Sequence, residues 1–367
     1  MVKKLANWWK DMPMKMDSET MNDIIERIWG GEVTKGDALF LATMDVHELS
    51  HLADRLRAAA AGDVVTYVVN RNVNFTNLCI NDCAFCAFRS DSGYVLSTEQ
   101  ILQKVEEAVD SGATEICIQG GLRRGAALDY YCEMLECIKS QFQVHLHALS
   151  PMEVHHAADN SDMSISAALT ALKRSGLDSM PGTAAEILDD RVRQKICPRK
   201  ISTAQWVEVI STAHKTGIPT TATMLYGHIE TREDRINHLL LIRDLQRKTH
   251  GFTEFIPLPF MAKNNRLGKI AHGPTEIDSL EVHALSRILL HRHIKNIQAS
   301  WVKLGRRLAQ TTLLCGVNDL GGTLIEENIS KSAGGTSGEY MSPEEFEETI
   351  IGAGRIPRRR TTLYELI

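Results

Sequence analysis

The stretch that decides the fold of this 367-residue chain is Asn74-Phe-Thr-Asn-Leu-Cys79-Ile-Asn-Asp-Cys83-Ala-Phe85-Cys86-Ala-Phe88. Its three cysteines have the spacing CxxxCxxC, and the run before them, residues 64–73, is rich in β-branched residues. Such a run predicts a strand, so the cysteines are expected on the loop that leaves it. Loops at strand ends often carry functional groups, and this loop is therefore the first candidate for a site.

Cysteine thiolates commonly hold iron–sulfur clusters, and three thiolates on a four-iron cluster leave one iron without a protein ligand. A structural zinc site is the weaker alternative, because nothing near Cys79 supplies a fourth ligand at zinc-finger spacing. A disulfide framework is typical of small secreted chains rather than of one this long. The remaining five cysteines are interpreted as buried apolar side chains: Cys117, Cys132, Cys137, Cys197 and Cys315.

Composition excludes several classes of function. The net charge is -5, and lysine and arginine are spread along the sequence. The chain therefore lacks the concentrated positive charge that nucleic-acid-binding proteins carry. No apolar run approaches the roughly 20 residues that cross a bilayer. The N-terminal residues 1–15, with Trp8 and Trp9, lack a signal-peptide core. We therefore expect a cytoplasmic protein that does not bind membranes.

From Gly62 onward, short apolar runs alternate with amphipathic segments, as in βα units around a parallel sheet. The eight predicted strands are Val64–Asn74, Glu115–Gln119, Gln143–Ala148, Leu177–Met180, Pro219–Met224, Phe252–Pro257, Ile297–Val302 and Leu313–Gly316. The helices expected between them include Ser97–Ser111, Asp129–Ser140, Thr203–Thr216, Arg232–Thr249 and Glu276–Lys295. Eight alternations in this length favour an α/β fold of the TIM type, a (β/α)8 barrel, over an open doubly wound sheet.

Three segments are expected along the chain. Residues 1–60 form a helical cap, or alternatively a partner-binding arm; residues 61–325 form the barrel; residues 326–367 form a C-terminal extension that packs on it. In such a barrel the chemistry lies at the carboxyl ends of the strands, where the cysteine loop falls.

Polar groups follow several other strands. Gln119-Gly120-Gly121 comes after the second strand, and paired glycines allow close approach of another molecule or simply form a tight turn. After the fourth strand, Glu186 and the basic run 195–200 suit polar ligand groups, but Glu186 equally suits the first turn of a helix. His228, Glu254 and the pair Asn318 and Asp319 follow the fifth, sixth and eighth strands. Each is a candidate substrate contact, with a structural histidine, an ion pair and a plain turn as the respective alternatives.

The cysteine loop closely resembles the signature of the radical S-adenosylmethionine (SAM) superfamily. The resemblance implies a radical SAM (β/α)8 barrel in which Cys79, Cys83 and Cys86 bind a 4Fe-4S cluster. The open iron would then hold the amino and carboxylate groups of SAM. It further implies cofactor contacts from Phe85, Gln119, Gly120, Gly121 and Glu186. The usual glutamate of the superfamily's GGE motif is replaced by Leu122, so Gln119 or backbone carbonyls are expected to supply acceptors.

Five longer phrases narrow the resemblance to the tyrosine-using subunit of FO synthase (CofH type). These phrases are residues 74–80, 176–187, 220–231, 251–260 and 318–323. This resemblance implies a transferase that cleaves L-tyrosine and joins its 4-hydroxybenzyl part to 5-amino-6-(D-ribitylamino)uracil, in the biosynthesis of the deazaflavin FO. Because only one cysteine triplet is present, a separate radical SAM subunit would close the deazaflavin ring, and an unidentified one-electron donor would be needed.

Two other functions stay open at this point. The radical SAM enzymes of futalosine-dependent menaquinone synthesis, aminofutalosine synthase and dehypoxanthine futalosine cyclase, resemble the cysteine, Tyr-Gly-His and Asn-Asp segments as well. The phrases 176–182 and 252–259 favour the FO enzymes over them. A non-enzymatic iron–sulfur carrier or redox sensor would hold a cluster without cleaving SAM.

Overall fold

The computed structural model of the chain describes residues 18–367. The expectations for residues 1–15, with Trp8 and Trp9, therefore lie outside the described residues. Nine strands are assigned within residues 18–367: β1 (Val64–Val68), β2 (Asn70–Val73), β3 (Glu115–Ile118), β4 (His145–Ala148), β5 (Thr220–Tyr226), β6 (Phe252–Pro259), β7 (Asn296–Ile297), β8 (Asp319–Gly322) and β9 (Ile356–Arg359).

These strands close into a ring of parallel neighbours. Three sheets have the orders β8-β1-β9, β2-β3-β4 and β5-β6-β7. Single bridges join them: His147 pairs with Ser179, Met180 pairs with Thr220, and Gln298 pairs with Asp319. The strands β1 and β2 are the two halves of the first barrel strand, and Ser179 with Met180 takes the place of the fourth. The predicted (β/α)8 barrel is confirmed.

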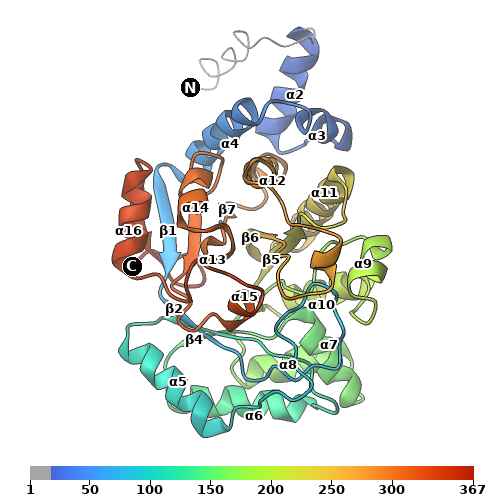
Figure 1. Cartoon of the computed structure of the whole chain (residues 1–367), viewed down its shortest axis with the longest axis vertical. Helices are drawn as coiled ribbons and strands as arrows, with labels where there is room; N and C mark the ends of the chain where they lie inside the picture. The colour runs from blue at the N-terminus through green and yellow to red at the C-terminus, as the bar shows by residue number, and fades with distance from the viewer. Residues whose placement is uncertain (1–17) are drawn as a thin grey trace.

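Helices surround this ring (Figure 1). They are α2 (Ser18–Gly30), α3 (Lys35–Leu41), α4 (Val46–Ala61), α5 (Thr98–Asp110), α6 (Leu128–Lys139), α7 (Pro151–Asn160), α8 (Ile165–Arg174), α9 (Asp190–Ile196), α10 (Thr203–Lys215), α11 (Arg232–Thr249), α12 (Glu276–Leu290), α13 (Trp301–Leu304), α14 (Arg306–Thr312), α15 (Asn328–Ser332) and α16 (Pro343–Gly352), with a 3-10 turn η2 at Leu267–Lys269. Ser97 and Gln100 form the capping box that starts α5. The predicted helix Glu276–Lys295 ends early, at Leu290.

The last two predicted strands need correction. The strand predicted at Leu313–Gly316 is wrong: this apolar segment is the turn that follows α14. The eighth strand is β8, so Asn318 and Asp319 stand at its start and not on a loop after its end. The seventh strand is shorter than predicted, because Trp301 already begins α13.

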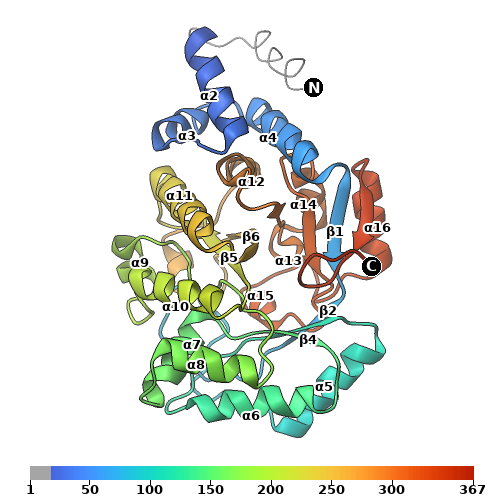
Figure 2. The ribbon, with the colours of Figure 1, turned by 180° about the vertical axis from the view of Figure 1, so that it is seen from behind.

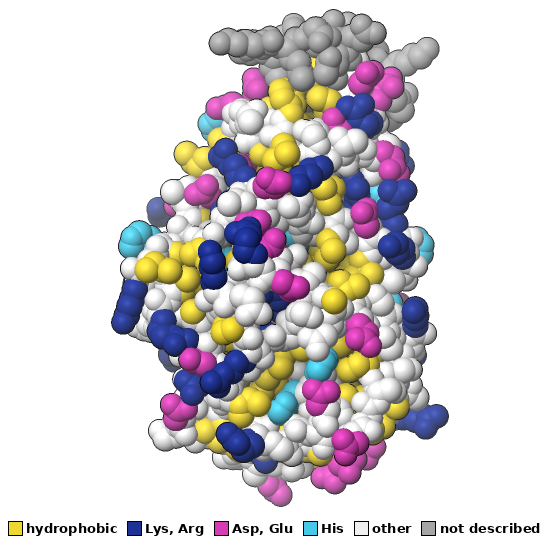
Figure 3. Space-filling model, turned by 90° about the vertical axis from the view of Figure 1, so that its right-hand side faces the viewer, with side chains coloured by type: hydrophobic (Ala, Val, Ile, Leu, Met, Phe, Trp, Pro, Cys, Tyr) yellow, Lys and Arg dark blue, Asp and Glu magenta, His cyan; other side chains and the backbone are white. Residues whose placement is uncertain are grey.

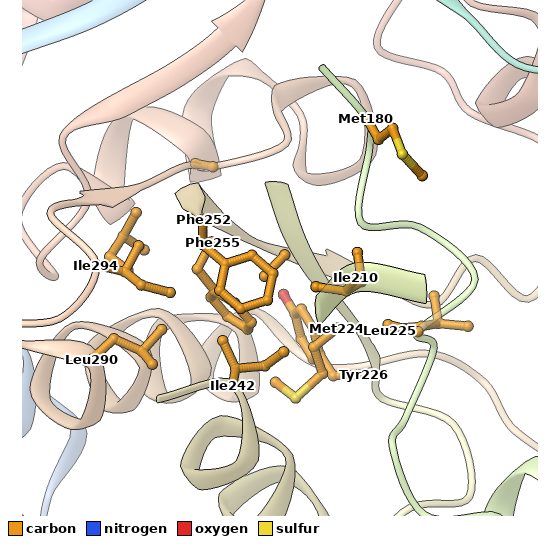
Figure 4. Packing of buried hydrophobic residues seen from close by; sticks show 14 of the residues in the cluster. Met180, Ile210, Met224, Leu225, Tyr226, Ile242, Phe252, Phe255, Leu290 and Ile294 are labelled. Atoms are coloured by element: carbon orange, nitrogen blue, oxygen red, sulfur yellow. The ribbon is translucent and has the colours of Figure 1, made fainter. Parts of the chain in front are cut away.

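Side chains alternate across the barrel wall with the period of two that strands impose. In β5 and β6, Met224, Tyr226 and Phe255 point outward, where they pack with residues of α11 and α12 such as Ile242 and Leu290 (Figure 4). Their neighbours along the strand face the barrel interior. The outward set forms the core between sheet and helices, and the inward set lines a cavity.

The two ends of the described chain pack on the barrel differently. The helices α2, α3 and α4 lie together beyond one edge of the ring, and α4 packs along α12 (Figures 1 and 2). At the other end, β9 adds to β1 in parallel register, with Val64 opposite Ile356. The backbone NH of Arg360 then donates to the carbonyl of Tyr67, which directs the following residues toward the barrel interior. The boundaries at residues 60 and 325 stay predictions.

The outer surface carries charges of both signs. On the face shown in Figure 3, Lys and Arg side chains are interspersed with Asp and Glu. Among residues 18–367, no helix is both long enough and apolar enough to cross a bilayer.

Candidate active site

The barrel encloses a cavity of about 410 Å³ that opens beside the cysteine loop. Every second residue of four stretches along β2, β3, β5 and β6 faces it, so this part of its wall is built by the strand period itself. These residues are Asn70, Asn72 and Asn74, then Glu115, Cys117 and Gln119, then Thr221, Thr223 and Leu225, and then Glu254, Ile256 and Leu258. The wall is therefore mainly polar near β2 and β3 and more apolar near β6.

The cysteine loop is fixed by three neighbouring segments. The NH of Ile80 donates to the carbonyl of Leu122 at 2.9 Å, and the NH of Ala84 donates to the carbonyl of Ile196 at 2.7 Å. In return, the carbonyl of Ala84 accepts from the NH of Leu267 at 2.8 Å. Backbone bonds to loops after the second, fourth and sixth barrel strands thus hold the three cysteines at the cavity mouth.

Cys79, Cys83 and Cys86 are all free thiols, all half-buried and all on the cavity wall. Burial raises the pKa of Cys83 to about 12, so the bare thiol is protonated and would release its proton on binding a metal. No group of three or more His, Cys, Asp or Glu side chains in the described part of the chain is close enough to hold a single metal ion. A four-iron cluster binds each thiolate to a different iron, so it needs ligands that lie further apart.

Other observations at the mouth fit a bound cluster and cofactor. The side-chain amides of Asn72, Asn74 and Asn81 line the cavity, and each has one buried polar atom without a hydrogen-bond partner. Unpaired buried polar atoms are costly, and a polar ligand in the cavity would satisfy them. The residues at the cavity mouth therefore suit a 4Fe-4S cluster and SAM.

The two glycines after β3 are required by the cysteine loop itself. A Cβ on Gly121 would lie 2.2 Å from the carbonyl oxygen of Leu78 and 3.0 Å from the Cβ of Cys79. A Cβ on Gly120 would lie 2.6 Å from the ring of Phe75. The pair lets the loop pack directly on the end of β3, which is the close-approach interpretation of paired glycines with the protein's own backbone as the partner.

Glu153 is a site residue that the sequence analysis missed. It is buried, lines the cavity, and accepts hydrogen bonds from the backbone NH groups of Gly120 at 3.1 Å and Ser150 at 2.6 Å. Burial raises its pKa despite these bonds. The capping box of Ser150 and Glu153 at the start of α7 is visible in the sequence, but it predicts only a helix start. The carboxylate of Glu153 thus holds the Gln119–Gly121 segment, which is followed by Leu122 where the GGE motif has a glutamate.

Glu186 also lines the cavity, where it forms an ion pair with Lys200. The Lys200 ammonium lies 5.3 Å from the centre of the Phe85 ring, so a cation–π contact connects the pair to the cysteine loop. The alternative interpretation of Glu186 as a first-turn helix residue is wrong, because α9 starts later, after its N-cap Asp189.

The far end of the cavity contains a buried charged network. Glu254 lies within β6 rather than at its end, and its carboxylate accepts from the Tyr364 hydroxyl at 2.5 Å and from Gln298 at 3.1 Å. Arg360 lines the same end and lies 3.6 Å from Glu254. Burial raises the pKa of Glu254 to about 7, although Arg360 opposes this shift. Residues of the C-terminal segment thus take part in the cavity floor, which no local pattern predicted.

Three predicted substrate contacts, His228, Asn318 and Asp319, do not line the cavity. The side chain of His228 is fully buried, with Nδ1 3.0 Å from the carboxylate of Glu230 and Nε2 3.1 Å from the carbonyl of Leu225, so it is a structural histidine. Asn318 binds Arg287 at 2.5 Å, and Asp319 binds Thr66 at 2.5 Å. The prediction that this pair lies at the substrate pocket is wrong, because both side chains are buried at the start of β8 and neither lines the cavity.

Comparison with known proteins agrees with this geometry. The profile of the radical SAM superfamily matches residues 73–242, and that of the CofH/MqnC C-terminal region matches residues 249–367. The maturase HydG of the FeFe-hydrogenase from Carboxydothermus hydrogenoformans superposes with a TM-score of 0.73 at 17% identity, covering 99% of this chain and 83% of that one. Methylornithine synthase superposes with a TM-score of 0.68 at 16% identity, covering 91% and 97%. These two likenesses concern the fold, which together with the cysteine loop is that of a radical SAM enzyme.

Full-length relatives define the family more narrowly. A protein of Archaeoglobus fulgidus is 61% identical over 322 residues, 88% of this chain and 94% of its own length. One from Methanosarcina barkeri is 56% identical over 356 residues, 95% of each chain. Both bear the name 5-amino-6-(D-ribitylamino)uracil–L-tyrosine 4-hydroxyphenyl transferase. The chain belongs to this family of radical SAM transferases.

Proposed function

We propose that this chain cleaves L-tyrosine and transfers its 4-hydroxybenzyl part to 5-amino-6-(D-ribitylamino)uracil, as the name of its relatives states for them. The observation that carries the proposal is the barrel cavity, which joins the cysteine loop at its mouth to a wall that is polar near β2 and β3 and to a charged floor. A single cavity of this kind places an amino acid and a polar acceptor side by side, which is the main demand of a transfer between them.

Cys79, Cys83 and Cys86 are the proposed ligands of the 4Fe-4S cluster, and Phe85, Gln119, Gly120, Gly121 and Glu186 the proposed contacts of SAM. When bound, these groups supply the hydrogen-abstracting radical chemistry. The protein residues do the rest: Glu153 and the glycine pair hold the cofactor side of the cavity, while Glu254 and Gln298 offer hydrogen-bonding groups to the acceptor.

An anaerobic incubation tests the proposal. The reconstituted protein is mixed with dithionite, SAM, L-tyrosine and the ribitylaminouracil, and the products are identified by mass spectrometry. Product that joins the two substrates is expected with tyrosine and not with phenylalanine, because a site built to bind the phenol hydroxyl leaves polar groups unpaired when the hydroxyl is missing. Turnover of futalosine-pathway substrates in place of tyrosine would instead place the protein among the menaquinone enzymes.

The proposed partners follow from the same reaction. The product still needs ring closure, so a separate radical SAM subunit is proposed to act next, and a one-electron donor is proposed to reduce the cluster. Mixing the product with candidate ring-closing subunits and measuring deazaflavin fluorescence tests the first of these.

A further inference from the structure

Four cations line the cavity, and one of them differs from the rest. Arg89 pairs with Asp91 at 2.6 Å, Arg360 pairs with Asp319 at 2.6 Å, and Lys200 pairs with Glu186. Lys303, in the short helix α13 after β7, has no carboxylate within 4.0 Å among the described residues; the side-chain contact of its ammonium is the Met261 sulfur at 3.7 Å.

A thioether is a weak acceptor and carries no charge, so this contact does not compensate the ammonium. Burial lowers the pKa of Lys303, against the opposing effects of the more distant Glu327, Glu186 and Cys86. An enclosed charge without a partner is unfavourable, and a fold keeps one at low cost only where an opposite charge arrives from outside. In this cavity the arriving group is a ligand.

The carboxylates of the cavity wall are already engaged. Glu115 accepts from the Asn70 amide at 2.8 Å, Glu327 accepts from the Ser330 NH at 2.8 Å, and the remaining three have the partners described above. None of them is available to neutralise Lys303 without losing a bond. Among the four cations of the described cavity wall, Lys303 is therefore the one without a paired carboxylate.

We infer that Lys303 binds the α-carboxylate of the amino-acid substrate, an inference that rests on the proposed function. Of the three expected ligands, the ribitylaminouracil carries no carboxylate. The carboxylate of SAM is the one that the open iron of the family chelates. The carboxylate of L-tyrosine is left, and a half-buried ammonium on the cavity wall is a strong hydrogen-bonding partner for it. Lys303 is thus a positioning and specificity residue for tyrosine.

Equilibrium binding to the cluster-loaded protein, without reductant so that no turnover occurs, tests this role. L-Tyrosine and tyramine, which lacks the carboxylate, are titrated into the parent and into Lys303→Met, Lys303→Arg and the exposed control Lys331→Met. Lys303→Met should weaken tyrosine binding roughly 10- to 100-fold, the range of a hydrogen bond to a charged group, and leave tyramine binding unchanged. Lys303→Arg should recover most of the loss, and Lys331→Met should resemble the parent.

A second readout separates binding from folding. Because the parent lysine is uncompensated without substrate, Lys303→Met should melt at the same temperature as the parent or higher. Equal loss of tyrosine and tyramine binding, a lowered melting temperature with unchanged tyrosine binding, or a loss of SAM binding alone would each overturn the inference. A parent protein that fails to bind tyrosine would overturn the proposed function as well, whereas a parent and Lys303→Met that bind it equally overturn only the role of Lys303.

Discussion

Arg360 of the C-terminal segment and Asp319 of β8 form a two-point ion pair inside the barrel. The guanidinium donates from Nε to Oδ2 at 2.6 Å and from Nη2 to Oδ1 at 3.1 Å. Both residues are almost completely buried, and Arg360 also stacks over the Tyr364 ring at 4.0 Å. The last residues of the chain therefore close the end of the barrel opposite the cysteine loop.

The first prediction concerns the stability of this pair. Removing one partner of a buried ion pair leaves the other charge uncompensated, so Asp319→Asn should lower the free energy of unfolding by about 3 to 5 kcal/mol. Urea unfolding measures the change, and Arg358→Ala, at an exposed position of β9, is the matched control. Asp319 also accepts from the Gln298 amide at 3.2 Å, so the loss of stability should come with a changed KM for the ribitylaminouracil through Gln298 and Arg360. An unfolding free energy equal to that of the parent would mean that the pair does not stabilise this end of the barrel.

The sequence predicts some strands of the barrel better than others. Strands β3, β5 and β6 are apolar runs flanked by helices, so their pattern locates them. The strand β8 has the sequence Asp319-Leu-Gly-Gly322, which lacks that pattern. Its carboxylate is acceptable inside the barrel only because Arg360 follows 41 positions later. A long-range pair of this kind leaves no local signal.

The site shows the same division. The cysteine loop was predictable because its three ligands lie within eight residues of each other. Glu153, Lys303 and Arg360 are single polar residues on three separate elements, and only the barrel brings them to one cavity. The prediction of His228 as a substrate contact places the residue correctly after β5. It does not take into account that Glu230, two residues later, pairs with the imidazole inside the protein.

The second prediction is that Cys79, Cys83 and Cys86 are each needed for the cluster. Cys83→Ala should lose most of the bound iron and the associated visible absorbance, and should form no 5'-deoxyadenosine from SAM. Cys137→Ala, at a half-buried cysteine outside the cavity, should keep both properties. Near-parent SAM cleavage by Cys83→Ala is the result that contradicts the assignment.

A third prediction tests the packing of the glycine pair. In Gly121→Ala the new methyl group would meet the backbone of Leu78 at 2.2 Å, a contact that only a shift of the cysteine loop relieves. We expect reduced iron retention and a lower melting temperature. Gly36→Ala, within α3 where the nearest atom is 3.7 Å away, should be neutral or slightly stabilising. Full cluster content in Gly121→Ala would show that the loop tolerates the displacement.

The fourth prediction uses pH to test whether the buried Glu230 carboxylate stabilises the turn after β5. The neighbouring Glu230 is buried, and hydrogen bonds from His228, Arg235 and the Gly227 NH lower its pKa from 4.5 to about 2 against the effect of burial. A depressed pKa in the folded state adds stability above the unfolded value and loses it as the pH falls, here between about 4.5 and 2.

The contribution is on the order of 3 kcal/mol at neutral pH. The difference in unfolding free energy between the parent and Glu230→Gln should therefore shrink as the pH falls from 4.5, as urea titrations at several pH values would measure. The exposed Glu365→Gln should show no such trend. A difference that stays constant with pH would mean that the Glu230 charge is not what stabilises the turn.

The last prediction concerns Glu254, which the structure leaves as a candidate contact for the acceptor. With its pKa raised to about 7, this carboxylate changes charge across neutral pH. The ribitylaminouracil presents amine and hydroxyl donors, which bind better to a carboxylate than to a carboxylic acid that is itself a donor. The KM for the acceptor should therefore fall as the pH rises through about 7 in the parent. In Glu254→Gln this KM should be higher and, because the amide does not titrate, independent of pH.

Tyr364→Phe tests how the surroundings of Glu254 set its pKa. The substitution removes the hydroxyl that donates to Glu254 at 2.5 Å, so the ionised carboxylate is less favoured and the fall in KM should occur at a higher pH. SAM cleavage at saturating tyrosine serves as the internal control, since the cofactor side of the cavity is unchanged in both variants. A flat KM profile in the parent would exclude Glu254 from acceptor binding and leave it, with Arg360 and Tyr364, as part of the barrel floor alone.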